Sequence, residues 1–433
     1  METNLLQENP LASPRSYKTL LACMGGNVIE WYDFMIYGYF SSIIGHLFFP
    51  SSNKTASLLL SLLVFAIGLI ARPVGGILMG YIGDRISRKK SLILSVYLMF
   101  FATALIGLLP TYESIGLWAP FLLFTLRIIQ GLAMGGEYAG TMVLMVETAP
   151  KERKGLYGSF AALSLVIGML LASIVTLLVH QFSNEQILGG GWRIPFFLSV
   201  IGLVCTIYMR RNLIDPAFFN YLKTRKTLSS SPFKEMCSTN LSLIIHTILL
   251  QTVLAIGMYT ITVYFVNYVR EYLQFSKQYG FGINIIGMIF LGMSTVLSGW
   301  LSDLYGRRKV LFIASLLIMA SGFISVYLSS LKEVNTYLFS QIILCFAIGQ
   351  FLGSTPSALA EIFPPEIRYT SCAFTNNVAM AIFGGTAPTL IFYGLKLTGD
   401  PYVPAYYLAL GAIISIFSIR SIYKPGRYLV GNE

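Results

Sequence analysis

Long apolar runs dominate the chain, and they alternate with short loops that concentrate Gly, Pro, Lys and Arg. Each run is continuous, and most are long enough to cross the hydrocarbon core as a helix, which takes roughly 20 residues. Membrane β-barrels instead show short segments of alternating polarity. The pattern therefore predicts an all-α polytopic membrane protein with twelve transmembrane helices. The predicted spans are residues 18–48, 55–80, 91–110, 117–147, 156–180, 194–209, 240–269, 280–301, 309–330, 336–360, 371–396 and 402–422.

The composition agrees with this prediction. Of the 433 residues, 55% are hydrophobic and only 11% are charged, whereas soluble domains are nearer a quarter charged. The net charge of +11 would suggest a nucleic-acid partner in a soluble protein, but the positions of the charges argue against one.

Basic residues gather in alternate loops. If the amino terminus is inside, one face holds the clusters near residues 85–90, 151–154, 210–234, 307–309 and 424–427. The other face has only Lys54, Arg193, Arg270, Lys277, Lys332 and Lys396. Cytoplasmic loops carry the excess of Lys and Arg, so both termini are expected to be cytoplasmic. We find no signal-peptide pattern in the polar first 19 residues.

Several functional classes are disfavoured. The five cysteines form no C-x-x-C pair, so neither disulfides nor a metal site is expected. The three histidines are isolated, which argues against an enzyme, and we expect no cofactor. No G-x-x-x-x-G-K-[ST] phosphate loop occurs, so ATP is not expected to supply the energy.

A duplicated loop divides the chain into halves. GYIGDRISRKK begins at Gly80 and GWLSDLYGRRK begins at Gly299, about half a chain later. We predict a cytoplasmic segment 1–17, a six-helix bundle 18–209, a linker 210–239, a second bundle 240–422 and a tail 423–433. Parallel repeats of this kind are one construction of secondary transporters, with the substrate site at the midplane between them.

The duplicated loops are predicted to act as a conformational latch. The glycines allow close helix approach, the aspartates can meet a helix amino terminus or a basic partner, and the trailing basic residues hold the loop at the membrane surface. The predicted latch residues are Gly80, Asp84, Arg85, Arg88, Gly299, Asp303, Arg307 and Arg308.

These paired loops resemble the signature of the major facilitator superfamily. GNVIEWYDFMIYG from Gly26, RPVGGILMG, RIIQGLAMGGEYAG, GWRIPF and AEIFPPEIRYTSCAFTNNVAMAIFGGTAP narrow the resemblance to the metabolite:proton symporter family, from about Tyr17 to Tyr423. That family includes proline/betaine, 2-oxoglutarate, citrate and shikimate carriers. The resemblance implies two six-helix bundles and alternating access. Ser87, Leu304 and Asp215 depart from the family pattern, which leaves the conformation of the loops open.

Five charged residues fall inside predicted spans: Glu30, Asp33, Arg72, Arg127 and Glu137. An ionised group at a helix centre costs roughly 2.5–3.5 kcal/mol on insertion scales, so it usually faces a partner or a pathway. Burial and mutual repulsion both favour protonation of one of two neighbouring carboxyls. We therefore expect Glu30 or Asp33 to carry a coupled proton, with Glu137 as the next candidate.

Structural alternatives remain for each charge. Glu30 or Asp33 could belong to an ion pair that fixes helix register, and Glu137 could anchor a basic residue of a loop. Arg72 could be a latch or a ligand, and Arg127 could modulate the carboxyl or receive an anionic substrate group. Trp31, Tyr32 and Tyr259 could hold a cationic amine. The residues predicted to bind substrate are Asn27, Tyr37, Arg72, Arg127, Gln130, Tyr259, Gln350, Asn376 and Asn377.

The sequence thus predicts a monomeric secondary transporter of the plasma membrane, the inner membrane in a bacterium, surrounded by lipid. It would import a small metabolite with protons by alternating access. Two interior arginines against three acids favour a zwitterion such as proline or betaine, or a small monocarboxylate. The alternative is a symporter of 2-oxoglutarate or citrate, and a channel or a transport-inactive sensor is a further one.

Overall fold

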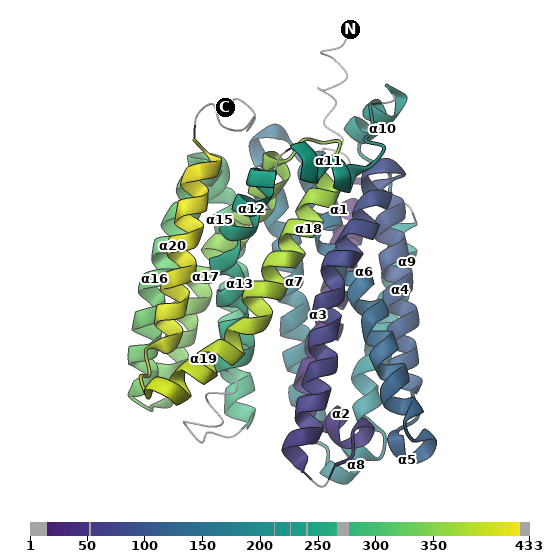
Figure 1. Ribbon diagram of the computed structural model, residues 1–433, viewed down its shortest axis with the longest axis vertical. Coiled ribbons are helices and arrows are strands. Elements are labelled where there is room, and N and C mark those ends of the chain that lie inside the picture. The colour runs from purple at the N-terminus through teal and green to yellow at the C-terminus, as the bar shows by residue number, and fades with distance from the viewer. Residues whose placement is uncertain are drawn as a thin grey trace.

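Apolar helices form two bundles that stand side by side in the computed structural model (Figure 1). The structure describes residues 15–51, 53–211, 213–225, 227–239, 241–265 and 277–424, and every regular element among them is helical. Helix α1 begins and α20 ends at the same end of the molecule, where the duplicated loops also lie (Figure 1). This end is called the loop end below.

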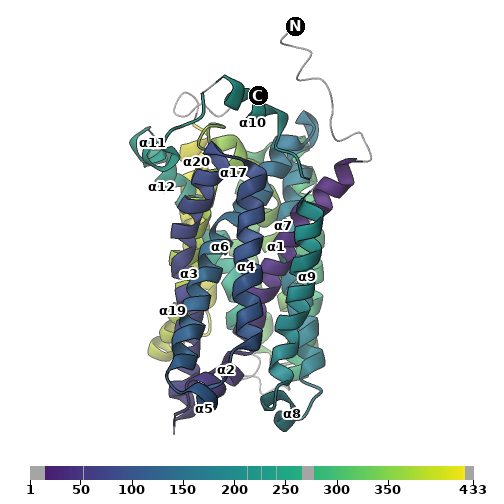
Figure 2. The ribbon, with the colours of Figure 1, turned by 90° about the vertical axis from the view of Figure 1, so that its right-hand side faces the viewer.

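The first bundle contains six long helices. They are α1 (Arg15–Tyr39), α3 (Lys54–Arg85), α4 (Arg88–Leu108), α6 (Trp118–Thr148), α7 (Lys154–Val179) and α9 (Ile194–Arg210). Short helices lie between them: α2 (Ser41–Phe48), α5 (Tyr112–Ile115), η1 (Lys151–Arg153), α8 (Asn184–Leu188) and η2 (Gly191–Arg193). The linker that follows contains α10 (Ala217–Thr224) and α11 (Pro232–Thr239) at the loop end (Figure 2).

The second bundle contains more broken helices. Its elements are α12 (Leu241–Leu250), α13 (Thr252–Tyr259), η3 (Thr260–Tyr264), α15 (Lys277–Tyr305), α16 (Arg307–Ser330), α17 (Val334–Ile362), α18 (Arg368–Ala379), η4 (Met380–Gly384), α19 (Gly385–Thr398) and α20 (Val403–Ile422). Both η3 and η4 are π-helices.

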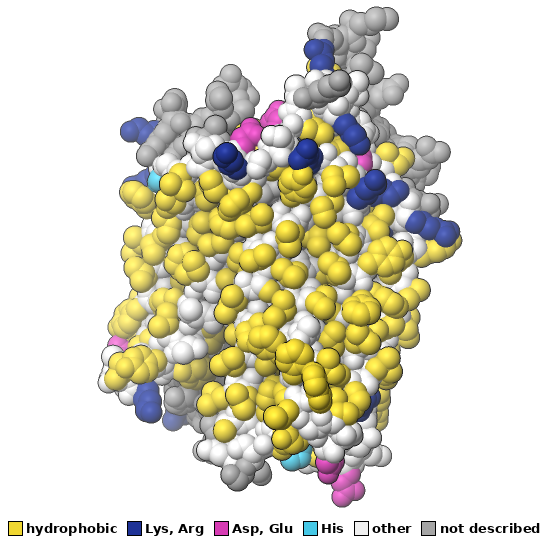
Figure 3. Space-filling view, turned by 45° about the vertical axis from the view of Figure 1, so that its right-hand side comes forward, with side chains coloured by type: hydrophobic (Ala, Val, Ile, Leu, Met, Phe, Trp, Pro, Cys, Tyr) yellow, Lys and Arg dark blue, Asp and Glu magenta, His cyan; other side chains and the backbone are white. Residues whose placement is uncertain are grey.

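Eleven helical stretches in the described part of the chain are long and apolar enough to cross a membrane. Helix α1 runs alongside them (Figure 2), but Asn27, Glu30 and Asp33 interrupt its apolar run. Together these helices confirm the predicted all-α polytopic class. The surface between the two ends is mostly hydrophobic, and Lys and Arg gather at the loop end (Figure 3).

The prediction of one continuous span over 18–48 was wrong. Helix α1 ends at Tyr39, and α2 packs against the start of α3. A Cβ on Gly45 would lie only 2.7 Å from the carbonyl oxygen of Ser57, and the Ser57 hydroxyl donates to the Phe49 carbonyl at 2.7 Å. The chain therefore turns to make this contact at the end of α1.

Two other predicted spans are also interrupted. Span 240–269 breaks at Gln251, because the Val253 N–H donates to the Ser415 hydroxyl on α20 at 3.1 Å instead of continuing the helix. Residues 266–269 of that span lie outside the described part of the chain. Span 371–396 contains η4 just before Pro388. Because proline lacks an N–H and its ring clashes with the carbonyl four residues earlier, a wider turn relieves this conflict.

The two bundles meet along helices that carry small residues. Helices α3 and α6 pack against α18, and α7 packs against α15 and α17. Gly80 and Gly299 lie at equivalent crossings, since an added Cβ would come within 2.6 Å of the Thr370 Cα and of the Gly155 carbonyl oxygen respectively. Because glycine has a hydrogen atom in place of a side chain, the backbones of the two bundles can approach closely at these positions.

Within the first bundle, we predict that Gly135→Ala destabilises the protein. An added Cβ would overlap the Arg72 carbonyl oxygen and the Gly76 nitrogen, and neither backbone atom can move aside alone. The cost of overpacking should be about 1–3 kcal/mol and should appear as a lower apparent Tm in detergent.

Gly282→Ala is the matched control, because nothing lies within 4 Å of its added Cβ. Alanine is a better helix former by about 1 kcal/mol, so this variant should unfold at the same or a higher temperature. Equal Tm values for the two variants would contradict the packing described for α3 and α6.

Candidate functional site

Asp84 joins the two bundles at the loop end. Its carboxylate accepts hydrogen bonds from the backbone N–H groups of Tyr369 at 3.0 Å and Thr370 at 2.8 Å, at the start of α18. It also pairs with Arg88, one turn further along the chain. A carboxylate at a helix amino terminus is stabilised by the free N–H groups and the helix dipole. Asp84 therefore caps a helix of the opposite bundle.

Asp303 makes the same arrangement in reverse. Its carboxylate accepts from the N–H groups of Gly155 at 2.7 Å and Leu156 at 2.8 Å, at the start of α7. Arg307 donates to Asp303 at 2.8 Å and to Glu361 at 3.2 Å. The duplicated loops thus form two similar contacts, each between a loop of one bundle and a helix end of the other.

The remaining loop residues differ between the copies. Arg85 is exposed and donates to the Ser230 carbonyl in the linker at 3.0 Å. The equivalent position of the second loop is Leu304, which has no such donor. Ser87 is extended and caps α4 by accepting from the Lys90 N–H at 3.0 Å. Its counterpart Gly306 has a φ of 84°, a conformation that favours glycine. The Ser87 departure from the family pattern therefore gives this loop its own capping bond.

A tyrosine reinforces the first of these contacts. Tyr369 of α18 inserts its ring between Gly83 and Gly140 of the first bundle, each of which is too close to the ring to carry a side chain. Its hydroxyl donates to the Gly136 carbonyl at 2.9 Å and accepts from Ser91 at 3.0 Å. The buried hydroxyl is thus satisfied across the interface between the bundles.

Asp33 lies at the end of a directional chain of hydrogen bonds inside the first bundle. Arg127 donates to the Gln130 amide oxygen at 2.8 Å, Gln130 donates to the Thr103 hydroxyl at 2.9 Å, and Thr103 donates to Asp33 at 2.6 Å. The Arg127 guanidinium also lies 4.1 Å from the centre of the Tyr37 ring. All of these side chains are buried. Arg127 and Asp33 are therefore connected through two intervening polar side chains.

Glu30 faces a different partner. Its nearest basic group is Arg72 on α3, with a closest N–O distance of 4.0 Å, and both side chains are 1% exposed. The Arg72 Nε donates to the Asn377 amide oxygen at 3.0 Å, and Asn377 donates to the Gly135 carbonyl at 2.6 Å. Arg72 thus connects α1 and α3 with α18 of the second bundle.

The two acids of α1 therefore belong to separate networks. Glu30 lies 4.0 Å from Arg72, whereas Asp33 accepts a hydrogen bond from Thr103, so the two carboxyls have different partners although they are neighbours in the sequence. Three residues along a helix place the two carboxyls on neighbouring sides, and each side meets different helices. Glu30 lies beside Arg72, which contacts the second bundle through Asn377, whereas Asp33 lies in the interior of the first bundle.

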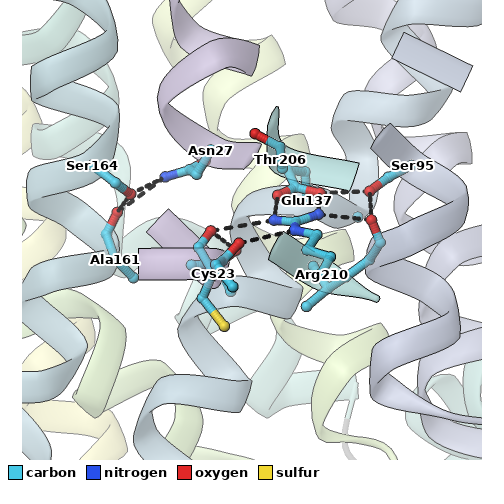
Figure 4. Close-up of polar contacts among 12 residues, drawn as sticks. Cys23, Asn27, Ser95, Glu137, Ala161, Ser164, Thr206 and Arg210 are labelled. Carbon is cyan, nitrogen blue, oxygen red and sulfur yellow. Dashed lines mark hydrogen bonds and ion pairs between the residues drawn. The ribbon is translucent and has the colours of Figure 1, made fainter. Parts of the chain in front are cut away.

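Glu137 forms a tight pair with Arg210, a residue that the sequence analysis placed in the linker. Arg210 is the last residue of α9 and is fully buried. Its guanidinium binds both Glu137 carboxylate oxygens and the carbonyls of Ala22, Cys23 and Leu92 (Figure 4). These bonds use all five guanidinium N–H groups.

The sequence analysis counted Arg210 among the basic residues of the linker, but the structure buries it at the end of α9. Its position beside Arg211 at a predicted helix end suggested exposure, but Gly26 leaves space for it, since an added Cβ would overlap the Arg210 guanidinium. The Gly25–Gly26 pair was the available sequence signal. Arg210 joins α1, α4, α6 and α9 near their loop ends.

The other predicted substrate residues have mixed surroundings. Asn27 donates to Ser164 at 2.7 Å and to the Ala161 carbonyl at 3.0 Å, which ties α1 to α7. Gln350 donates to Ser294 at 2.8 Å, which ties α17 to α15. The Tyr259 hydroxyl and the Asn376 amide oxygen are buried without a hydrogen-bond partner in the described residues. Their roles in binding stay predictions.

Comparison with known proteins agrees with this architecture. The family described as Sugar (and other) transporter matches residues 18–236 and 242–423. The proline/betaine transporter of Salmonella typhimurium is 31% identical, over 93% of this chain and 82% of that protein. The Dickeya dadantii transporter OusA, named for glycine betaine, proline, ectoine and pipecolic acid, is 31% identical with the same coverage.

Solved structures show the same fold. The proton:xylose symporter XylE, known from E. coli, has a TM-score of 0.78 at 17% identity, covering 95% of this chain and 96% of that one. The transporter FucP in its outward conformation has a TM-score of 0.66 at 15% identity, covering 94% and 100%. The chain belongs to the sugar (and other) transporter family, and it has the fold of the major facilitator superfamily.

Proposed function

We propose that this protein is a proton-coupled symporter that imports a small zwitterion of the proline or betaine type by alternating access. It would act as a monomer in the plasma membrane, with both termini in the cytoplasm. The main support for the proposal is the chain of hydrogen bonds from Arg127 to Asp33 in the interior of the first bundle. The names of the relatives support the substrate class.

Asp33 is the proposed proton carrier. Its Oδ2 accepts from Thr103, and the Ser199 hydroxyl of α9 also lies near the carboxyl. Oδ1 makes no hydrogen bond among the described residues, so this oxygen can take a proton. Protonation would remove the negative charge that balances Arg127. The chain through Thr103 and Gln130 transmits this change because each donor polarises the next. The proton would thereby bias the conformation of the first bundle.

The duplicated loops supply the proposed conformational switch. Closing the loop end makes the two aspartate caps, and opening it breaks both, because each joins opposite bundles. A substrate held between the bundles would then be exposed to one side at a time. A channel would not need such paired contacts, and a transport-inactive sensor would not need the buried proton site.

A dicarboxylate or tricarboxylate substrate remains the alternative. At the described bundle interface, both terminal nitrogens of Arg72 are free of hydrogen bonds, and an acid faces them directly. A multiply charged anion would be repelled by Glu30, whereas a zwitterion would leave the site neutral.

We predict that Asp33→Asn abolishes accumulation driven by a proton gradient in proteoliposomes, by about tenfold or more, while substrate exchange is retained within about threefold. A neutral side chain resembles the protonated carboxyl, so the loaded carrier can still reorient. Asp33→Glu keeps a titratable group and should keep part of the accumulation. Gradient-driven accumulation by Asp33→Asn at the wild-type level would assign the proton to another residue, with Glu137 as the next candidate.

We predict that Asp84→Asn opens the loop end without greatly changing substrate affinity. The variant loses the charged acceptor of two N–H groups and of Arg88. This loss should destabilise the state with the loop end closed by about 2 kcal/mol, which shifts the equilibrium between the closed and open states about 30-fold. Pulsed EPR between labels at the exposed Lys90 and Arg308, on opposite bundles, should show a longer distance, together with slower turnover. Substrate affinity should change little, because Asp84 is about 18 Å along α3 from Arg72.

Asp400→Asn is the matched control for the latch. Asp400 caps the Tyr402 N–H at 2.8 Å within one bundle, at the other end of the molecule, so its loss should leave the EPR distance unchanged. Loss of substrate binding by a folded Asp84→Asn protein would show that this residue does not act as a latch alone.

The topology predicts opposite labelling of two exposed sites. In a cysteine-free background, Lys234→Cys lies in the linker at the loop end and Glu185→Cys lies in α8 at the opposite end. A membrane-impermeant maleimide should label Glu185→Cys in intact cells and label Lys234→Cys only after lysis. The reverse result would place the loop end outside the cell.

A further inference from the structure

Glu30 and Arg72 form a buried charge pair with no hydrogen bond between the two side chains. Their closest atoms are 4.0 Å apart. Both oxygens of Glu30 and both terminal nitrogens of Arg72 have no hydrogen-bond partner in the described part of the chain. A buried charged group without a partner costs more than the roughly 1–3 kcal/mol of a neutral one. This pair therefore has free hydrogen-bonding capacity on both charges.

The same bundle shows that a closed pair is possible. Glu137 and Arg210 are buried to the same degree, yet they bind each other through two bonds and leave no guanidinium N–H unused. The open geometry of Glu30 and Arg72 is thus a property of their own surroundings.

Contacts with both bundles hold Arg72 in place. Its Nε is bound by Asn377, which is itself fixed by the Gly135 carbonyl, and its guanidinium lies 5.4 Å from the centre of the Trp31 ring. With Nε occupied, Nη1 and Nη2 remain as a planar fork that matches a carboxylate. The fork lies where α1, α3 and α18 meet, about half-way along α3.

Further free polar atoms lie on the same helices or near them. The indole N–H belongs to Trp31, which follows Glu30 on α1, and the Tyr259 hydroxyl belongs to α13 of the second bundle. Both are buried without a hydrogen-bond partner among the described residues. One acid, one guanidinium fork, one indole face and one phenol together offer complements to an anion and to a cation.

We propose that Glu30 and Arg72 bind the two ends of a short zwitterion. Arg72 holds the substrate carboxylate through Nη1 and Nη2, and Glu30 holds the cationic nitrogen together with the Trp31 ring. Because the two protein charges are only 4.0 Å apart, the substrate charges must also be close, as in an α-amino acid or a glycine-type betaine. The loaded site is neutral overall, which minimises the cost of burial.

This proposal rests on the proposed transport function and divides the work of the two acids. Asp33 carries the proton, and Glu30 recognises the substrate. A quaternary nitrogen fits the site as well as a protonated amine does, because a carboxylate and an aromatic face bind either by charge.

The test compares two zwitterions with a carboxylate that lacks the cation. Binding of L-proline, glycine betaine and cyclopentanecarboxylate, which keeps the ring and carboxylate of proline without the amine, is measured by calorimetry on the full chain in detergent. The wild-type protein should bind both zwitterions at least about ten times more tightly than cyclopentanecarboxylate. Glu30→Gln should lose this preference, whereas Arg72→Gln should weaken binding of all three.

Cyclopentanecarboxylate is the internal control for folding, because a misfolded Glu30→Gln protein would lose every ligand. If that variant does not fold, Glu30→Asp should fold and keep a reduced preference for zwitterions. Three results would each overturn the proposal. Glu30→Gln could bind zwitterions as tightly as the wild type does, the wild type could bind the three ligands with equal affinity, or the wild type could bind neither zwitterion. Binding without gradient-driven accumulation would instead overturn proton coupling and leave the site standing.

Discussion

The free-energy cost of placing a charge inside an apolar helix bundle determines how this protein is built. Each buried ionised group must meet an opposite charge or enough hydrogen-bonding groups, because water is excluded. The first bundle uses two solutions. Glu137 and Arg210 form a closed pair that binds four helices together, whereas Glu30 and Arg72 are held apart with free donors and acceptors. The first arrangement stabilises the bundle, and the second provides a place for a ligand.

The distribution of charge also separates the tasks of the two halves. The acids and arginines of the central region belong to the first bundle, and the second contributes amides, hydroxyls and helix ends. Asn377 is the point where these contributions meet, because it binds Arg72 and the backbone of α6. At the loop end, each aspartate caps a helix of the opposite bundle. Movement between the bundles would therefore change the surroundings of Arg72 and of both caps together.

Much of this arrangement follows from sequence patterns. The apolar runs predicted the helices, and the duplicated loops predicted aspartates that meet helix amino termini. What failed depended on contacts between distant segments. Arg210 stands beside Arg211, as a solvated residue would, and only the space beside Gly26 allows it to be buried. Glu30 and Asp33 are neighbours in sequence, yet α3 and α4 give them different partners. Helical periodicity places side chains on faces but does not identify the helix that each face meets.

An experimental structure with a bound zwitterion would test most directly whether the two acids divide recognition and proton coupling. We predict the ligand carboxylate within hydrogen-bond distance of Arg72 Nη1 and Nη2, and the cationic nitrogen beside Glu30 and the Trp31 ring. Asp33 should still be bonded to Thr103 and should not touch the ligand. A ligand bound against Asp33 or Arg127, with Glu30 and Arg72 closed into a hydrogen-bonded pair, would contradict it.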